Sequence, residues 1–212
     1  MSELRLVSAC YEDWYPFDGM GLFDKFFATN DADDLRDGDV LVVWGGGDIP
    51  PEYYGKGRSS KSWASPTPSR RDQIEWALIQ KAKEIGIPMI GVCRGAQMMC
   101  AAAGGYLVQH VSGHGGNHVV RTHDGKEFIT NSIHHQMMFP ADAAHEDIAV
   151  MPEARSKEYW DVDNVMQNVD VEREYIFFND IKAHAIQWHP EGMDLNSEAN
   201  KYVKSQLERT LR

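Results

Sequence analysis

Residues 87–99 read Ile-Pro-Met-Ile-Gly-Val-Cys-Arg-Gly-Ala-Gln-Met-Met, an apolar run that ends at a cysteine between two glycines. Good helix formers follow, and Gly104-Gly105 ends the expected helix. A Gly-x-Cys-x-Gly sequence at a strand-to-helix junction is typical of a nucleophile elbow. We expect so tight a turn that a side chain at Gly91 or Gly95 would collide with neighbouring backbone. Cys93 would then be presented at the end of the sheet.

The cysteine of this turn stands at the expected start of a helix, where the macrodipole and unpaired N–H groups favour an anion. Cys93 is therefore a candidate nucleophile, and the backbone N–H of Arg94 is placed to donate to a developing oxyanion. The alternative is a buried cysteine in an ordinary strand–helix unit, because free cysteine is often buried. That alternative does not explain why glycines stand on both sides of the cysteine.

Charge and hydropathy argue against two classes of partner. The chain has 212 residues, with 21 basic and 32 acidic residues and a net charge of −11. Nucleic acid and anionic membranes bind basic patches, so neither is an expected partner. No apolar run approaches the roughly 20 residues of a membrane span. A chain of this length builds one sizeable core, and we expect a single domain over residues 1–212.

The start of the chain and its cysteines predict a cytoplasmic location. Met1–Arg5 lacks the basic and then apolar pattern of a secretion signal. Cys10, Cys93 and Cys100 are odd in number and lack metal-ligand spacing, which fits free thiols in a reducing compartment. Cys100 lies on the same helix face as Cys93 and is expected to belong to the core.

Glycines also follow another apolar segment. Residues 40–44 are continuously apolar, as in parallel strands buried on both faces, and Gly45-Gly46-Gly47-Asp48 follows. Ligands bind at the carboxyl ends of strands in open α/β sheets, and glycines let backbone amides approach them. The glycine spacing and the following Pro50-Pro51 do not fit a dinucleotide fingerprint. A tight loop without a ligand is the open alternative.

The first half of the chain alternates between strand and helix patterns. We expect strands over 4–9, 40–44 and 87–92, a short helix over 21–28, and helices over 69–85 and 96–103. The polar segment 52–68 is expected to be a surface loop near the site. Ser69 and Asp72 form a capping-box-like start for the helix that Gly86 ends. This alternation predicts an α/β fold with a doubly wound, mostly parallel sheet of the flavodoxin-like kind.

The second half is typical of an antiparallel hairpin region added to this core. Short strand candidates between glycine and polar turns cover 106–111, 119–120, 127–130 and 148–151. A final hairpin is expected from 174–178 and 183–187, around Asn179-Asp180. A helix over 196–211 closes the chain, which contains no internal repeat.

A nucleophilic thiol needs a base and a group that orients the base. His189 stands in Gln-Trp-His-Pro-Glu, after an apolar strand, and Pro190 favours an extended conformation at His189. Residues two apart in an extended chain point to the same side, so Glu191 can lie beside the imidazole. Cys93, His189 and Glu191 would then be nucleophile, general base and acid, and orienting carboxylate. A turn with an exposed histidine is the alternative for this segment alone.

Other histidines could bind metal or substrate. His110, His114 and His118 are four residues apart, but the glycines between them disfavour a stable helix there, so we expect no metal site. His134-His135-Gln136 lie in a polar loop between strands and could contact substrate. The alternative is that these histidines only form hydrogen bonds within the loop, and the sequence does not decide between the two.

Together these segments resemble the class I glutamine amidotransferase superfamily, and within it the branch of γ-glutamyl-amine (γ-glutamyl-GABA) hydrolases. The matching pieces follow the family's order and span Gly45 to Glu191. They are Gly-Gly-Gly-Asp-Ile-Pro-Pro at 45–51, Arg-Asp at 71–72, the elbow at 91–97, Gly-Gly at 104–105, Gly-His at 113–114 with His118, Asn-Ser-Ile-His-His-Gln at 131–136 and Gln-Trp-His-Pro-Glu at 187–191.

The resemblance implies an α/β fold and a thioester mechanism on a γ-glutamyl amide, with no cofactor. By the same resemblance, backbone N–H groups at Gly46, Gly47 and Arg94 would hold the oxyanion. Gln97 and the loop of His134 and Gln136 would line the pocket for the α-amino and α-carboxylate groups.

Two activities and a non-catalytic role remain open at this stage. The first is a stand-alone hydrolase of glutamine or a γ-glutamyl amine, a small-molecule substrate. The second is a glutaminase subunit that delivers ammonia to a separate synthetase, and a homodimer is also possible. A binding or regulatory module that keeps the fold is the third, which the intact Cys93, His189 and Glu191 argue against. The acidic segment Ser156 to Arg173 matches nothing in the family.

Overall fold

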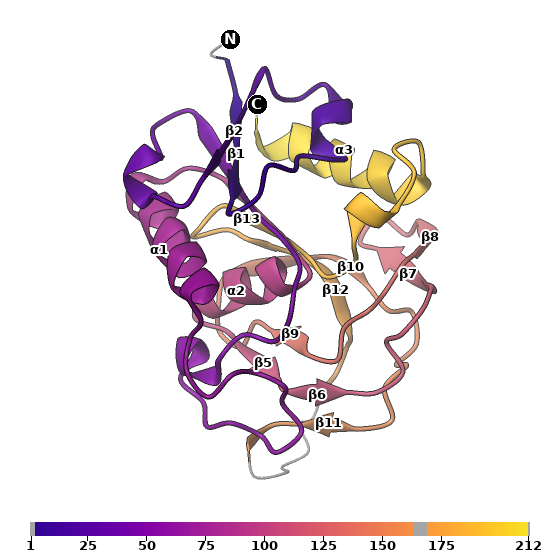
Figure 1. Ribbon diagram of the computed structural model, residues 1–212. Coiled ribbons are helices and arrows are strands. Elements are labelled where there is room, and N and C mark those ends of the chain that lie inside the picture. Colours follow the sequence, from indigo (N-terminus) through magenta and orange to yellow (C-terminus); the bar gives the residue numbers. More distant parts are fainter. Residues whose placement is uncertain (1–2, 163–168, 212) are drawn as a thin grey trace.

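The computed structural model describes residues 3–162 and 169–211, and its main feature is a nine-stranded mixed sheet (Figure 1). In spatial order the strands are β2 (Lys25–Thr29), β1 (Arg5–Ala9), β3 (Asp39–Val43), β4 (Met89–Val92), β13 (Ala183–Ile186), β12 (Arg173–Phe178), β10 (His145–Val150), β7 (His118–Thr122) and β8 (Glu127–Thr130). Two small sheets pair β5 (Tyr106–Val108) with β9 (Met137–Phe139) and β6 (His110–Val111) with β11 (Tyr159–Trp160).

The direction of pairing changes once across the large sheet. The strands from β2 to β13 are parallel, and those from β13 to β8 are antiparallel. The predicted α/β fold with a parallel core is therefore confirmed, as is the predicted hairpin of β12 and β13. The antiparallel strands continue the same sheet, so one hydrogen-bonded surface carries both regions.

Helices cover both faces of the sheet. On one face α1 (Arg70–Ile85) and α2 (Arg94–Ala102) pack on a core that includes Leu41 and Val43. On the other face α3 (Glu198–Thr210) packs on a core that includes Val40 and Val42, so successive residues of β3 point to opposite faces. Figure 1 shows α3 separated from α1 and α2 by the sheet. All five residues of β3 are buried, which explains why its sequence is apolar after Asp39, whose carboxylate pairs with Arg5.

Local sequence signals place the first helix. Ser69 accepts a hydrogen bond from the backbone N–H of Asp72, and the Asp72 carboxylate accepts one from the backbone N–H of Ser69. This is the predicted capping box. Gly86, with φ +74°, ends the helix in the left-handed conformation. The loop to β4 is therefore short, and α1 leads directly to the strand that carries Cys93.

The predicted helix over 21–28 is wrong. Residues 25–29 form the edge strand β2, which pairs in parallel with β1. Phe26 and Phe27 are exposed, at 38% and 36%, so core packing does not fix this segment. Hydrogen bonds to the distant strand β1 therefore decide the conformation of this segment. The short strands β9 and β11 were likewise not predicted, and each consists of two or three residues held by one partner strand.

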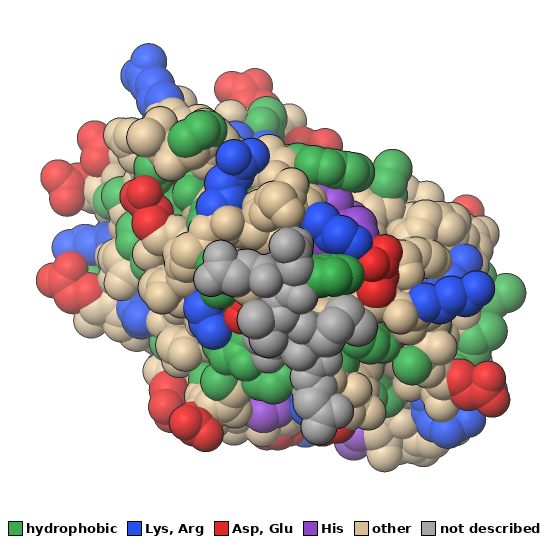
Figure 2. Space-filling view, turned by 90° about the horizontal axis from the view of Figure 1, so that it is seen from below, with side chains coloured by type: hydrophobic (Ala, Val, Ile, Leu, Met, Phe, Trp, Pro, Cys, Tyr) green, Lys and Arg blue, Asp and Glu red, His purple; other side chains and the backbone are tan. Residues whose placement is uncertain are grey.

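The surface carries charges of both signs. In Figure 2 acidic and basic side chains are interspersed with apolar ones over the face seen from below. No helix within residues 3–162 and 169–211 is long and apolar enough to cross a membrane. Cys10, Cys93 and Cys100 are free, and Cys100 is fully buried in the core as expected. Residues 163–168 of the acidic segment lie outside the described residues.

Candidate active site

The predicted elbow is formed between β4 and α2. Cys93 has φ +49°, which is uncommon for a residue with a side chain, and it stands directly before the first residue of α2. A Cβ atom on Gly91 would lie 2.6 Å from the carbonyl carbon and oxygen of Gly95. A Cβ atom on Gly95 would lie 2.0 Å from the backbone oxygen of Val43. The two glycines are thus required by close backbone approach, as the sequence predicted.

His189 lies after β13, which is the parallel neighbour of β4. Its Nδ1 is 2.7 Å from Oε1 of Glu191, so the carboxylate holds this nitrogen in its N–H form. Asn131 fixes the backbone of the same residue: its Oδ1 accepts from the N–H of His189 and its Nδ2 donates to the carbonyl, both at 2.8 Å. The sequence analysis did not predict this role for Asn131, and two hydrogen bonds to a residue 58 positions away carry no local signal.

The thiol and the imidazole meet beside Gly45. A Cβ atom on Gly45 would lie 2.7 Å from Cε1 of His189 and 3.5 Å from Cβ of Cys93, so only glycine leaves room for both side chains. A hydrogen bond with Cys93, followed by that with Glu191, raises the pKa of His189 to about 10. Burial opposes the increase but is outweighed. The imidazole is therefore protonated at neutral pH next to the sulfur.

The side chain of Arg94 has a structural role. It is buried and forms ion pairs with Asp72 and Glu75 of α1. Arg71 also contacts Glu75, at 2.8 Å, and donates to the carbonyl of Gly45 at 2.8 Å. These contacts tie α1, the first turn of α2 and the glycine loop into one unit. The backbone N–H of Arg94 remains the group that the elbow presents at the helix start.

A small cavity of about 120 Å³ lies next to the thiol and unites residues predicted from separate motifs. Its lining consists of Gly46, Gly47, Asp48, Trp63, Cys93, Gln97, Ile133, His134, His135 and Gln136. Five of these were expected to contact the oxyanion or the substrate: Gly46, Gly47, Gln97, His134 and Gln136. Nε2 of Gln97 donates to the carbonyl of Gln136 at 3.2 Å, which joins α2 to the loop before β9.

Sequence comparison assigns the chain to a family. The peptidase C26 family profile matches residues 30–191, which include the elbow and the His-Pro-Glu segment. The chain belongs to the peptidase C26 family. It thus lies within the class I glutamine amidotransferase superfamily, as its motifs predicted.

Two relatives and one solved structure illustrate this membership. A Mycobacterium tuberculosis protein named "Putative glutamine amidotransferase Rv2859c" is 34% identical over 172 residues, covering 72% of this chain and 50% of that protein. The γ-glutamyl-CDP-amidate hydrolase of Campylobacter jejuni is 29% identical over 155 residues, covering 72% and 62%. The chain therefore spans half to less than two thirds of the length of these relatives. A crystal structure of a Thermotoga maritima glutamine amidotransferase, 13% identical, has a TM-score of 0.58 and covers 99% of this chain and 86% of its own, which confirms the fold.

Three cavity residues of this peptidase C26 member were not predicted as contacts: Asp48, Trp63 and Ile133. Asp48 accepts from the backbone N–H of Trp63 at 2.8 Å and lies 3.2 Å from Nε2 of His135. Burial raises the pKa of Asp48 to about 6. Burial, and then the neighbouring His110 and His134, lower the pKa of His135 to about 4, so this imidazole is neutral at pH 7. Asp48 directly follows the glycines that were expected near a ligand, and Trp63 lies in the segment 52–68 that was expected to be a loop near the site.

A second cavity lies beside the imidazole. It has a volume of about 350 Å³ and is lined by Tyr11, Asp13, Trp44, Gly45, His189 and Glu191. His189 lines this cavity and Cys93 lines the small one, and both side chains lie beside Gly45. Each of the two reactive side chains is therefore accessible from a cavity of its own.

Proposed function

We propose that this chain hydrolyses a γ-glutamyl amide bond, of glutamine or of a γ-glutamyl amine, through a thioester on Cys93. The observation that carries the proposal is the arrangement of three side chains: a thiol at a positive-φ elbow, an imidazole beside it, and a carboxylate 2.7 Å from the far nitrogen of that imidazole. Nucleophile, base and orienting group in this order form the general arrangement of covalent acyl transfer.

The proposed reaction has two halves. Cys93 gives its proton to Nε2 of His189, and the sulfur attacks the δ-carbonyl carbon of the γ-glutamyl group, whose carbonyl oxygen becomes an oxyanion. Nε2 of His189 then gives that proton to the leaving nitrogen as the C–N bond breaks, which releases an amine or ammonia and leaves a thioester. In the second half His189 takes a proton from water, and the hydroxyl attacks the thioester carbon. The C–S bond then breaks, the sulfur leaves as a thiolate beside the imidazolium, and glutamate is released. Glu191 stabilises the imidazolium throughout.

The small cavity suits the glutamyl half of the substrate. Backbone N–H groups at Gly46, Gly47 and Arg94 are the proposed oxyanion donors, because they border the sulfur from the glycine loop and from the start of α2. Gln97 and Gln136 offer amide groups in the same cavity. These two side chains are the proposed contacts for the α-amino and α-carboxylate groups, together with His134.

The larger cavity suits the leaving amine. It is lined by the imidazole that would protonate the leaving nitrogen, together with Tyr11 and Asp13. Asp13 is exposed, so an amine with a distant positive charge could pair with its carboxylate in water. This favours γ-glutamyl amines over glutamine as the proposed substrates.

A panel of γ-glutamyl amides, with glutamine included, tests this function. Each compound is incubated with the purified chain, and glutamate release is measured at steady state. We expect release without any added protein, with γ-glutamyl diamines turned over faster than glutamine. Cys93→Ala is the control and should release none. If the whole panel remains intact while the protein is folded, the proposal is wrong.

A second candidate is a glutaminase subunit that passes ammonia to a separate synthetase. The observation in its favour is an apolar rim at the mouth of the small cavity, where Trp63 and Ile133 are 77% and 76% exposed. Exposed apolar side chains at a site entrance are common where another protein binds. Glutamate release from glutamine that requires a second protein would select this candidate over the first.

A further inference from the structure

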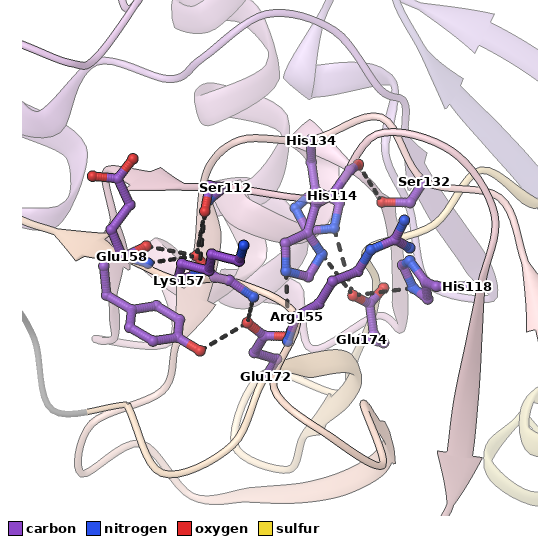
Figure 3. A network of polar contacts seen from close by, with 12 residues as sticks. Ser112, His114, His118, Ser132, His134, Arg155, Lys157, Glu158, Glu172 and Glu174 are labelled. Atoms are coloured by element: carbon purple, nitrogen blue, oxygen red, sulfur yellow. Dashed lines mark hydrogen bonds and ion pairs between the residues drawn. The ribbon is translucent and has the colours of Figure 1, made fainter.

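Five titratable side chains form a buried cluster beneath the small cavity, shown in Figure 3. His114, His118 and His134 come from the loops and the strand start around β7 and β9, and Glu172 and Glu174 come from the beginning of β12. Each residue is at most 9% exposed. None of the five carries a role in the proposed reaction except His134, whose other edge lines the cavity. We call these five residues the His–Glu cluster.

The distances within the cluster exceed those of hydrogen bonds. Oε1 of Glu174 lies 3.6 Å from Nδ1 of His114, 3.4 Å from Nε2 of His118 and 3.5 Å from Nε2 of His134. N–H···O bonds usually measure about 2.7 to 3.2 Å. Ligand atoms around a tetrahedral zinc ion with bonds of about 2.0 to 2.1 Å are about 3.3 to 3.4 Å apart. The three distances from Glu174 to the histidines are closer to the second value than to the first.

The protonation of His134 leaves a lone pair facing a carboxylate. Its Nδ1 is 2.9 Å from the carbonyl oxygen of Gln136, and because a carbonyl only accepts, Nδ1 must carry the proton. In the neutral ring, Nε2 is then a bare acceptor aimed at Glu174. Neither this nitrogen nor either oxygen of Glu174 has a hydrogen-bond partner within the described ranges. Two buried acceptors that face each other need a proton or a metal cation between them.

His114 repeats this arrangement between two carboxylates. Its Nε2 is 3.3 Å from Oε2 of Glu172, and its Nδ1 faces Glu174. A neutral imidazole donates from one nitrogen only, so one lone pair is left facing an oxygen. Glu172 already accepts hydrogen bonds from the backbone N–H groups of Arg155 and Ser156 and from the hydroxyl of Tyr159. A cation beside Glu174 would take the lone pair of Nδ1, and the proton on Nε2 would then face Glu172.

We propose that His114, His134 and Glu174 bind a divalent transition-metal ion of the zinc type. His118, which faces the same Glu174 carboxylate, would be a further ligand of this ion. The donor atoms of the first three lie within 4.8 Å of one another. Imidazole nitrogens and a carboxylate suit zinc, and the ion's charge would replace the missing protons.

The outer contacts also match those of a metal site. The Gln136 carbonyl and the Glu172 carboxylate each face the non-ligating nitrogen of one histidine, as the second shell of zinc-bound histidines commonly does. Because the site is buried and His134 also lines the small cavity, the ion would have a structural role. It would anchor the loop of residues 132–136 to β12.

The sequence argument against metal concerned a different donor set. It considered His110, His114 and His118 on one helix, and the described residues there form strands and turns, as the glycines predicted. The set proposed from the structure adds His134 and Glu174, which are 20 and 60 positions beyond His114. Only the folded chain brings them together.

A zinc titration tests the proposal without reference to activity. The purified chain is stripped with a strong chelator, and Zn²⁺ is added in competition with a chromophoric chelator. Since a thiol and His189 could also bind zinc, the titration is repeated with Cys93→Ser. We expect one equivalent of Zn²⁺ in both proteins, together with a rise of Tm. Absence of binding, or binding that is lost with Cys93→Ser, would overturn the proposal.

Variants locate the ion within the chain. Glu174→Gln and His114→Ala should weaken zinc binding by at least about 100-fold, because each removes a ligand. His145→Ala, which changes a partly exposed histidine outside the cluster, should bind zinc as the unmodified chain does. Equal binding by all three variants would place the ion elsewhere and refute the site.

A spectroscopic measurement covers variants that fail to fold. Co²⁺ added to the stripped unmodified chain should give the intense visible absorption of a four-coordinate site, and Zn²⁺ should abolish it. The weak spectrum of a hydrated six-coordinate ion would contradict the proposal. In that case the two carboxylates are balanced by protonated histidines, and the cluster is a buried ionic network.

Discussion

The reactivity of Cys93 and His189 depends on a few contacts made by each of these two residues. The thiol occupies a strained backbone position that the neighbouring glycines permit, and the imidazole is held by Glu191 on one side and by Asn131 at its backbone. Cys93 is buried in the core on the face that α3 covers, but its side chain is small compared with the large residues around it. Its removal should therefore affect chemistry far more than stability.

Replacement of Cys93 by alanine tests that separation. We expect glutamate release to fall below detection, because no other thiol lies at the elbow. Tm should change by no more than about 3 °C, since one sulfur atom at a cavity wall is lost. Enzyme assays and thermal melts of the same preparation check both results. A Tm loss of about 10 °C would mean that the thiol is a core residue.

The ionisation of His189 gives a second prediction. Its pKa in the folded chain is about 10, above the ordinary value of 6.5. The contribution of the imidazolium to stability is therefore complete below pH 6.5 and is lost as the pH rises toward 10. An NMR titration of the Cε1 proton should show a midpoint near 10.

The cause of this shift can be separated with Cys93→Ala. Because the hydrogen bond with Cys93 is the largest cause, the variant should show a lower midpoint, while Glu191 keeps it above 6.5. His189→Asn should show less loss of stability between pH 7 and 10 than the unmodified chain does. A midpoint near 6.5 in both the unmodified chain and the Cys93→Ala variant would contradict the stabilisation of the imidazolium by Cys93 and Glu191.

At the scale of elements, the elbow exists because β3, β4 and α2 approach each other without side chains between them. The missing Cβ of Gly95 lets the first turn of α2 contact the backbone of Val43 in β3. Arg94 then pairs with two acids of α1, so that both helices are fixed relative to the same strand ends. The position of the thiol is set by this packing rather than by the loop alone.

Glycine-to-alanine variants measure that packing. Gly95→Ala should lower the free energy of unfolding by about 3 kcal/mol or prevent folding, because the backbone must move away from Val43. Gly47→Ala is the matched control, since a Cβ there meets nothing within 4 Å. It should change stability by less than about 0.5 kcal/mol. Urea unfolding compares the two, and equal stability would show that the turn is not tightly packed.

At the scale of the whole molecule, one sheet carries the reactive residues and the glycine loop. Cys93 and His189 follow the adjacent parallel strands β4 and β13, and the glycine loop follows β3, so all three segments reach the same sheet edge. The His–Glu cluster begins on β12, the next strand along. The parallel and antiparallel halves are therefore connected through the strands that hold the candidate chemistry.

A continuous sheet predicts a single cooperative unfolding transition. The cores on the two faces share the same strands, so neither can lose its packing while the other remains folded. Differential scanning calorimetry of the chain should give equal calorimetric and van't Hoff enthalpies. Two resolved transitions would refute the prediction of one domain over residues 1–212.

The sequence by itself determined the elements whose signals are local. The elbow glycines, the capping box and the alternation of strand and helix depend on contacts within a few residues, and the spacing of His189 and Glu191 does too. Each was therefore visible in a short window.

Only the tertiary structure decided the features that join distant segments. These are the edge strand at 25–29, the clamp of Asn131 on His189 and the meeting of His134 with Glu174. No window of sequence contains both partners of such a contact. Its geometry arises from the sheet order, which brings residues tens of positions apart within a few ångströms.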